Sequence, residues 1–134
     1  MTEPTPDEKP LLLCLDLEPD SEALCRAALA RARRCGQPVQ VLHVMPAFSE
    51  PRPVEGRLHA LLGRCGAEVA RVMVESGSPE ERIPQVAARC GADPVVLGRR
   101  SRTTVDRIYV GSTTSAVISL CRTPVLVIPL PGEG

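Results

Sequence analysis

The residues best suited to chemistry lie between Asp93 and Thr113, where two glycines enclose an arginine-rich polar loop. An apolar run with β-branched residues stops at Gly98, and the loop then leads to Gly111 followed by Ser112. The pattern predicts a buried strand, a loop of phosphate size and the start of a helix. Glycine lets backbone approach a ligand closely, and a helix N-terminus offers free N–H groups to an anion. Hydroxyls and amides at the start of this helix can therefore hold a phosphate.

Other interpretations of these residues stay open. Gly98 and Gly111 can also be simple turn and helix-entry glycines. Four arginines in or beside the loop can neutralise phosphates through bidentate contacts, but such a run is also typical of a solvated surface. We interpret at least two of the four as surface residues: Arg99, Arg100, Arg102 and Arg107.

A carboxylate follows the first predicted strand directly. Residues 11–15 form a continuous apolar run that ends at Asp16. Such a run is typical of a central strand covered on both faces, so Asp16 is expected at the carboxyl edge of the sheet, as is Gly98. Asp16 either contacts a ligand there or caps the following loop or helix, and the sequence does not decide between these roles.

The rest of the chain alternates strands and helices. We predict strands at 11–15, 39–45, 68–74, 95–98 and 125–128. Helices are predicted from Asp20 or Ser21 to residue 35, at 57–65 and at 112–121, and a further helix, the third along the chain, ends at Cys90. Residues 46–54 are predicted to be a loop. The third helix begins either at Pro79, with Ser78 and Glu81 as a capping box, or nearer Ile83, because Pro84 interrupts the hydrogen bonds.

Three Arg-Cys-Gly triplets support this parse, because each comes a few residues before a predicted strand. A cation, a small buried residue and then a glycine are typical of a helix C-terminus. The triplets end at Gly36, Gly66 and Gly91. Strict alternation of strand and helix predicts an α/β fold with a parallel sheet and helices on both faces.

Composition excludes several classes of function. Lys plus Arg and Asp plus Glu both number 16, and the chain has one Tyr, one Phe and no Trp, which disfavours a nucleic-acid-binding protein. No apolar stretch of about 18 residues is present, and residues 1–10 lack the pattern of a signal peptide. We expect a cytoplasmic protein without a membrane partner, and read the six cysteines as reduced and mostly buried. His43 and His59 lack partners at metal-ligand spacing and are expected to be structural.

The glycine-containing stretch resembles the signature of the universal stress protein family. In that family a glycine, two residues, a second glycine, nine residues and then Gly-Ser or Gly-Thr bind the ribose and phosphates of ATP. Gly98, Ser101 and Gly111-Ser112 reproduce this spacing, with Ser101 in place of the second glycine. Residues 42–44, 92–98 and 123–129 are similar to the family's second, fourth and last strands, so the resemblance covers about residues 11 to 130.

The resemblance implies a fold and a set of site residues. The fold is a three-layer, Rossmann-like sandwich of the adenine nucleotide alpha hydrolase-like type, with a five-stranded parallel sheet of order 3-2-1-4-5. Residues 1–10 would be a flexible tail, 11–130 a single universal stress protein domain and 131–134 a short tail. ATP or AMP would be the ligand, with or without Mg²⁺. The residues implied to bind it are Asp16, Val44, Gly98, Arg100, Ser101, Gly111, Ser112 and Thr113.

From these observations we expect a sensor or regulatory module in the stress response that binds an adenine nucleotide and is not an enzyme, because no P-loop lysine or Ser-His-Asp arrangement is present. Two alternatives remain open. One is a dimeric interaction module that has lost nucleotide binding, for which Ser101 is the reason, and the other is a slow ATP hydrolase. Residues 125–128 are predicted to form an edge strand, and the family resemblance implies a homodimer there.

Overall fold

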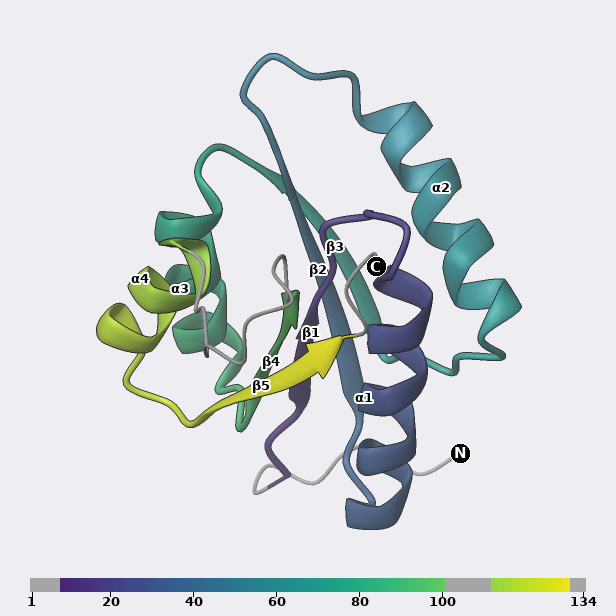
Figure 1. Cartoon of the computed structure of the whole chain (residues 1–134), viewed down its shortest axis with the longest axis vertical. Helices are drawn as coiled ribbons and strands as arrows, with labels where there is room; N and C mark the ends of the chain where they lie inside the picture. Colours follow the sequence, from purple (N-terminus) through teal and green to yellow (C-terminus); the bar gives the residue numbers. More distant parts are fainter. Residues whose placement is uncertain (1–7, 101–111, 131–134) are drawn as a thin grey trace.

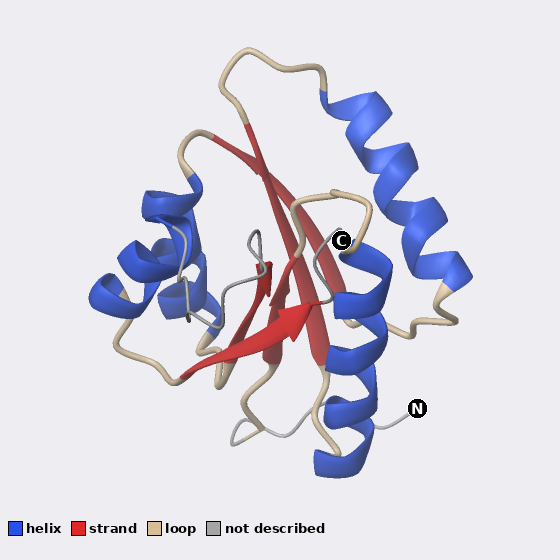
Figure 2. Ribbon diagram, viewed as in Figure 1, coloured by secondary structure: helices blue, strands red, loops and turns tan. Residues whose placement is uncertain are grey.

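A computed structural model describes residues 8–100 and 112–130 of the chain. The five strands form one parallel sheet of order β3-β2-β1-β4-β5, with the helices packed on its two faces (Figure 1; Figure 2). This order confirms the expected fold. The elements are β1 (Leu11–Cys14), α1 (Ser21–Cys35), β2 (Val39–Met45), α2 (Pro51–Arg64), β3 (Arg71–Ser76), α3 (Pro79–Cys90), β4 (Val95–Arg100), α4 (Ser112–Leu120) and β5 (Val125–Leu130).

Two apolar cores flank the sheet. Because side chains alternate along a strand, Leu11 and Leu13 of β1 face one core while Leu12 faces the other, and all three are completely buried. The first core lies against α1 and α2, and the second lies against α3 and α4. Figure 1 shows these helix pairs on opposite sides of the sheet. The central strand is therefore covered on both faces, as its continuous apolar sequence predicts.

The glycines of the Arg-Cys-Gly triplets end helices as predicted. Gly36 and Gly91 follow α1 and α3 in the left-handed conformation, with φ of 65° at both. The N–H of each of these two glycines donates to a carbonyl of the helix it closes. Gly66, one residue past the end cap of α2, has φ of 60°. Glycine suits all three positions because it adopts positive φ without a steric penalty.

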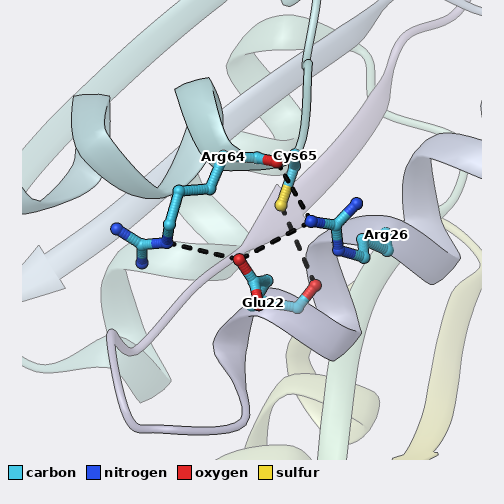
Figure 3. A network of polar contacts seen from close by, with 4 residues as sticks. All are labelled: Glu22, Arg26, Arg64 and Cys65. Atoms are coloured by element: carbon cyan, nitrogen blue, oxygen red, sulfur yellow. Dashed lines mark hydrogen bonds and ion pairs between the residues drawn. The ribbon is translucent and has the colours of Figure 1, made fainter.

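A polar network joins the start of α1 to the end of α2 (Figure 3). Glu22 forms ion pairs with Arg26 at 3.7 Å and with Arg64 at 3.3 Å. The Arg26 guanidinium donates to the Arg64 carbonyl at 3.0 Å, and the Cys65 thiol donates weakly to the Glu22 carbonyl at 3.9 Å. The charged side chains are largely exposed, so each pair contributes little free energy and mainly fixes how the two helix ends meet.

Several element boundaries differ from the predictions. The predicted loop at 46–54 is wrong at its end, because α2 already begins at Pro51, where a proline in the first turn lacks only an N–H that needs no partner. The third strand is shifted to 71–76. For α3, the earlier of the two predicted starts is observed, with Pro84 inside the helix. The predicted capping box is wrong, since Ser78 makes no side-chain capping bond.

The last two strands are longer than predicted. β4 does not stop at Gly98 but continues to Arg100, because β5 pairs with it over its whole length. β5 likewise continues past Pro129 to Leu130. A proline is tolerated in an edge strand where its missing N–H would face outward. Within the described ranges, none of the helices has the length and apolar character needed to cross a membrane.

Candidate functional site

The candidate site lies at the carboxyl edge of the sheet, where β1 and β4 end. These strands are neighbours, so Asp16 and Gly98, both expected at this edge, belong to adjacent strand ends. The chain passes from β1 to β2 on one side and from β4 to β5 on the other, so the strand order reverses here. Open parallel sheets bind their ligands at such switch points, beyond the carboxyl ends of the strands.

Asp16 organises the loop between β1 and α1. Its Oδ1 accepts the backbone N–H of Glu18 and the hydroxyl of Ser21, both at 3.1 Å. Leu17, between Asp16 and Glu18, has φ of 63°, and its carbonyl accepts a hydrogen bond from Arg57 of α2 at 2.9 Å. The loop-capping role of Asp16 is therefore confirmed. Its side chain is also exposed at the sheet edge, so contact with a ligand stays a prediction.

Val44 presents its backbone to the space beyond β1. The Leu42 carbonyl accepts the Leu15 N–H at 2.9 Å, so the backbone groups two residues later, at Val44, face the same side. The pairing of β1 with β2 ends at Cys14 and Leu42. Val44 therefore extends past the last paired residue of β1, which is a suitable position for backbone hydrogen bonds to the edge of a base.

Buried His43 helps to keep this position open. Its Nδ1 lies 2.7 Å from the Leu15 carbonyl oxygen, which is the acceptor that a continued strand pairing would offer to the N–H of Val44. A carbonyl only accepts, so Nδ1 carries a proton and donates it to Leu15. The expectation of a structural histidine is confirmed.

The glycine at residue 98 is explained by close packing, since this residue lies inside a strand and not in a turn. It lies within β4, opposite Ile128 of β5. A Cβ at this residue would come within 2.6 Å of Leu130 Cδ1 and 3.1 Å of Leu24 Cδ2. A side chain here would therefore force Leu130 to shift, so the close packing of α1 and the end of β5 on β4 favours glycine. The sequence spacing alone indicated a ligand role and missed this packing role.

The start of α4 meets the start of α3 through a carboxylate. Glu80 Oε1 accepts the hydroxyl of Thr113 at 3.0 Å, and its Oε2 accepts the hydroxyl of Ser78 at 2.5 Å. The hydrogen bond from Ser78, with further ones from the backbone N–H of Glu80 itself and from Thr113, lowers the pKa of Glu80 below its ordinary value. The predictions did not include Glu80 in the site. The only local signal was the pair of glutamates after Ser78.

The remaining candidates cannot all be placed. Arg100 is the last residue of β4, and Ser112 is the first residue of α4. Ser101 and Gly111 lie outside the described residues, as do two further candidate arginines, Arg102 and Arg107. In the described part, the structure thus brings the β1 end, the β2 end and the starts of α3 and α4 to one edge of the sheet.

The cysteines are all free thiols, and their environments differ. Burial raises the pKa of Cys14 strongly. Burial, with a contribution from the neighbouring Cys65, raises the pKa of Cys25 to about 12. Cys35 at the end of α1 is exposed, whereas the other five cysteines are buried or partly buried. Among the described residues, no group of three or more His, Cys, Asp and Glu could hold a metal ion.

A second surface feature lies at the opposite edge of the sheet. An open depression of about 520 Å³ is lined by residues that precede β1, β2 and β4, including Lys9, Gln37 and Asp93. The Gln37 amide donates to the carbonyls of Lys9 and Asp93 at 3.1 and 2.6 Å, so these groups tie the strand starts together. The amino edge thus has a structural explanation, and the carboxyl edge is the better candidate for ligand binding.

Comparison with known proteins gives consistent results. The sequence model of the universal stress protein family matches residues 59–129. Universal stress protein E of Escherichia coli K12 is 38% identical over 71 residues, which are 53% of this chain but only 22% of that protein. A universal stress protein structure from Archaeoglobus fulgidus is 25% identical, with 90% of this chain and 98% of that chain covered and a TM-score of 0.70. A structure of the universal stress protein from Archaeoglobus fulgidus in complex with dAMP is also 25% identical, with 90% and 97% covered and a TM-score of 0.67.

Proposed function

Because the chain belongs to the universal stress protein family, we propose that it binds an adenine nucleotide at the carboxyl edge of its sheet. The observation that supports this proposal is that β1 and β4 are neighbours where the strand order reverses, with Asp16 directly after β1 and Val44 extending past the last paired residue of β1. The similarity to a protein solved with dAMP supports the same ligand class. The chain would act as a sensor or regulatory module in a cytoplasmic stress response, without being an enzyme.

Each part of the nucleotide has a proposed partner. The adenine would meet the backbone of Val44, and the adenosine would also approach Asp16. Gly98 and Ser101 would border the ribose and phosphates, with Arg100 supplying positive charge. The phosphates would accept hydrogen bonds from Gly111, which precedes α4 in the sequence, and from the first two residues of α4, Ser112 and Thr113. A helix start has N–H groups without intrahelical partners and a positive dipole end.

The ligand would be ATP or AMP, and Mg²⁺ would accompany a polyphosphate. Mg²⁺ keeps several waters and is usually bound by one or two carboxylates together with phosphate oxygens. Asp16 and Glu80 are two carboxylates at this edge of the sheet, and both already accept hydrogen bonds. The donor set therefore fits a metal that arrives with the nucleotide and takes most of its ligands from phosphates and water.

Calorimetric titration of the purified, nucleotide-stripped protein tests the proposal. Saturable binding of AMP or Mg-ATP is expected for the wild-type chain. Gly111→Val should abolish it, because the added side chain blocks close approach of the phosphate to the backbone. Gly56→Val is the matched control, since it adds the same atoms on α2, where no heavy atom lies within 4 Å of the new Cβ.

Circular dichroism confirms in each case that the variant is folded. Equal loss of binding in both valine variants would contradict the assignment of the phosphate loop. No binding by the folded wild-type chain would contradict nucleotide binding itself and would favour an interaction module.

We further propose that β5 mediates a homodimer. β5 is the last strand of the sheet, and the Val95 N–H donates to the Pro124 carbonyl at 2.9 Å, so the alternate backbone groups at Val125 and Val127 face away from β4. An edge of this kind can pair with a second copy. Sedimentation at micromolar concentration should show a dimer for wild type and for Val127→Thr, and a monomer for Val127→Lys. A wild-type monomer would contradict the proposal.

A further inference from the structure

We propose that Glu80 shifts the phosphate selectivity of the nucleotide site toward an adenine nucleoside monophosphate and away from a metal-free triphosphate. This inference rests on the proposed nucleotide function and adds a specificity-determining residue to it. Glu80 lies in the first turn of α3, outside the family-like motif, and it reaches the motif only through space.

The carboxylate of Glu80 is held at the start of α4. Both of its oxygens accept hydroxyl hydrogen bonds, one from Thr113 at 3.0 Å and one from Ser78 at 2.5 Å. Two hydroxyl partners on different elements fix the side chain between the starts of α3 and α4. These two hydrogen bonds therefore hold the negative charge of Glu80 in one place at this edge of the sheet.

The charge lies beside the groups proposed to bind phosphate. The pKa of Glu80 is lowered by its hydrogen bonds, so the carboxylate is ionised at neutral pH. The hydroxyl of Thr113 is also already used by Glu80, so a phosphate must share this donor or rely on backbone N–H groups. A phosphate bound at the start of α4 would thus gain the helix dipole but would be repelled by one fixed carboxylate.

This repulsion grows with the charge of the ligand. At neutral pH, metal-free ATP carries about two more negative charges than AMP, whereas Mg²⁺ cancels two charges of ATP. Two added charges at about 8 Å from a carboxylate, in a water-like dielectric, weaken binding by about fivefold. The positive dipole end of α4 attracts the more negative ligand more strongly, so Glu80 opposes this effect and shifts the ratio of the two dissociation constants in favour of AMP.

The test is the ratio of the dissociation constants of metal-free ATP and AMP, measured by calorimetry in a buffer with chelator. In Glu80→Gln this ratio is expected to fall by about fivefold relative to wild type. Glu81→Gln is the matched control, because Glu81 is an exposed carboxylate in the same helical turn, and it should leave the ratio unchanged. Glu80→Asp keeps the charge and should retain most of the selectivity. The ratio of the dissociation constants of Mg-ATP and AMP should be the same in wild type and Glu80→Gln, because these two ligands carry about the same net charge.

The salt dependence of the ratio gives a second readout. Raising the salt concentration from about 0.05 to 0.5 M screens the repulsion from Glu80, so the ratio should fall more in wild type than in Glu80→Gln. An unchanged ratio in folded Glu80→Gln, or an equal change in Glu81→Gln, would overturn the selectivity role while leaving nucleotide binding intact. Absence of binding by folded wild-type chain for every nucleotide would instead overturn the proposed function, and the selectivity role with it.

Discussion

Replacing Gly98 with alanine tests how closely α1 and β5 pack on β4. The new Cβ would lie 2.6 Å from Leu130 Cδ1 and 3.1 Å from Leu24 Cδ2. Apolar carbons prefer separations of about 3.5–4.0 Å, so the Leu130 contact is short by about 1 Å. Leu130 is 6% exposed and Leu24 is 3% exposed, so neither side chain can simply turn into solvent. Overpacking of this kind lowers the unfolding free energy by about 1–3 kcal/mol.

Urea unfolding followed by circular dichroism measures this loss. Gly56→Ala in α2 is the control, because no atom lies within 4 Å of the added Cβ and a helix interior favours alanine by about 0.5–1 kcal/mol. In the double variant Gly98→Ala/Leu130→Ala the added methyl occupies part of the space left by the leucine. The loss of unfolding free energy in the double variant should then be smaller than the sum of the losses in the two single variants, by at least about 0.5 kcal/mol. A Gly98→Ala variant as stable as wild type would refute the packing explanation.

Three further outcomes follow from buried and charged groups. His43→Leu should lower the unfolding free energy by about 1–3 kcal/mol, because the Leu15 carbonyl loses its hydrogen-bonded partner, and unchanged urea unfolding would contradict this. A disulfide reagent should label exposed Cys35 in the native chain and reach Cys14 and Cys25 only in denaturant, since burial raises the pKa of both thiols; equal native rates would refute that order. The stability contributed by Glu80 should be fully present above its ordinary pKa of 4.5 and be lost as the pH falls through the lower folded-state value. Wild type and Glu80→Gln should therefore converge in stability at acid pH, and a constant difference would contradict the ionised carboxylate.

The order of the elements could be predicted because local signals mark most of them. The three glycines of the Arg-Cys-Gly triplets end their helices in the left-handed conformation, and the uninterrupted apolar run at 11–15 is buried on both faces. Boundaries near proline were less predictable. Pro51 is compatible with either a loop or a first helical turn, and its place in α2 depends on the packing of that helix against the sheet.

The candidate site could be predicted only where it follows from strand ends. Asp16 and Val44 are placed by the ends of β1 and β2, which the apolar runs define. The contact between Glu80 and Thr113 joins residues 33 positions apart and depends on α3 and α4 lying side by side. The close packing on Gly98 likewise involves Leu24 and Leu130, which are distant in sequence. No local pattern encodes either contact.

Nuclear magnetic resonance tests most directly whether the nucleotide binds at the carboxyl edge of the sheet. Backbone amide shifts of the ¹⁵N-labelled, nucleotide-stripped chain would be followed during titration with AMP. Saturable shifts are predicted at Asp16, Val44 and Thr113, which lie at the ends of β1 and β2 and at the start of α4. Shifts confined to the opposite edge, around Gln37 and Asp93, or no saturable shifts at all, would contradict the proposed site.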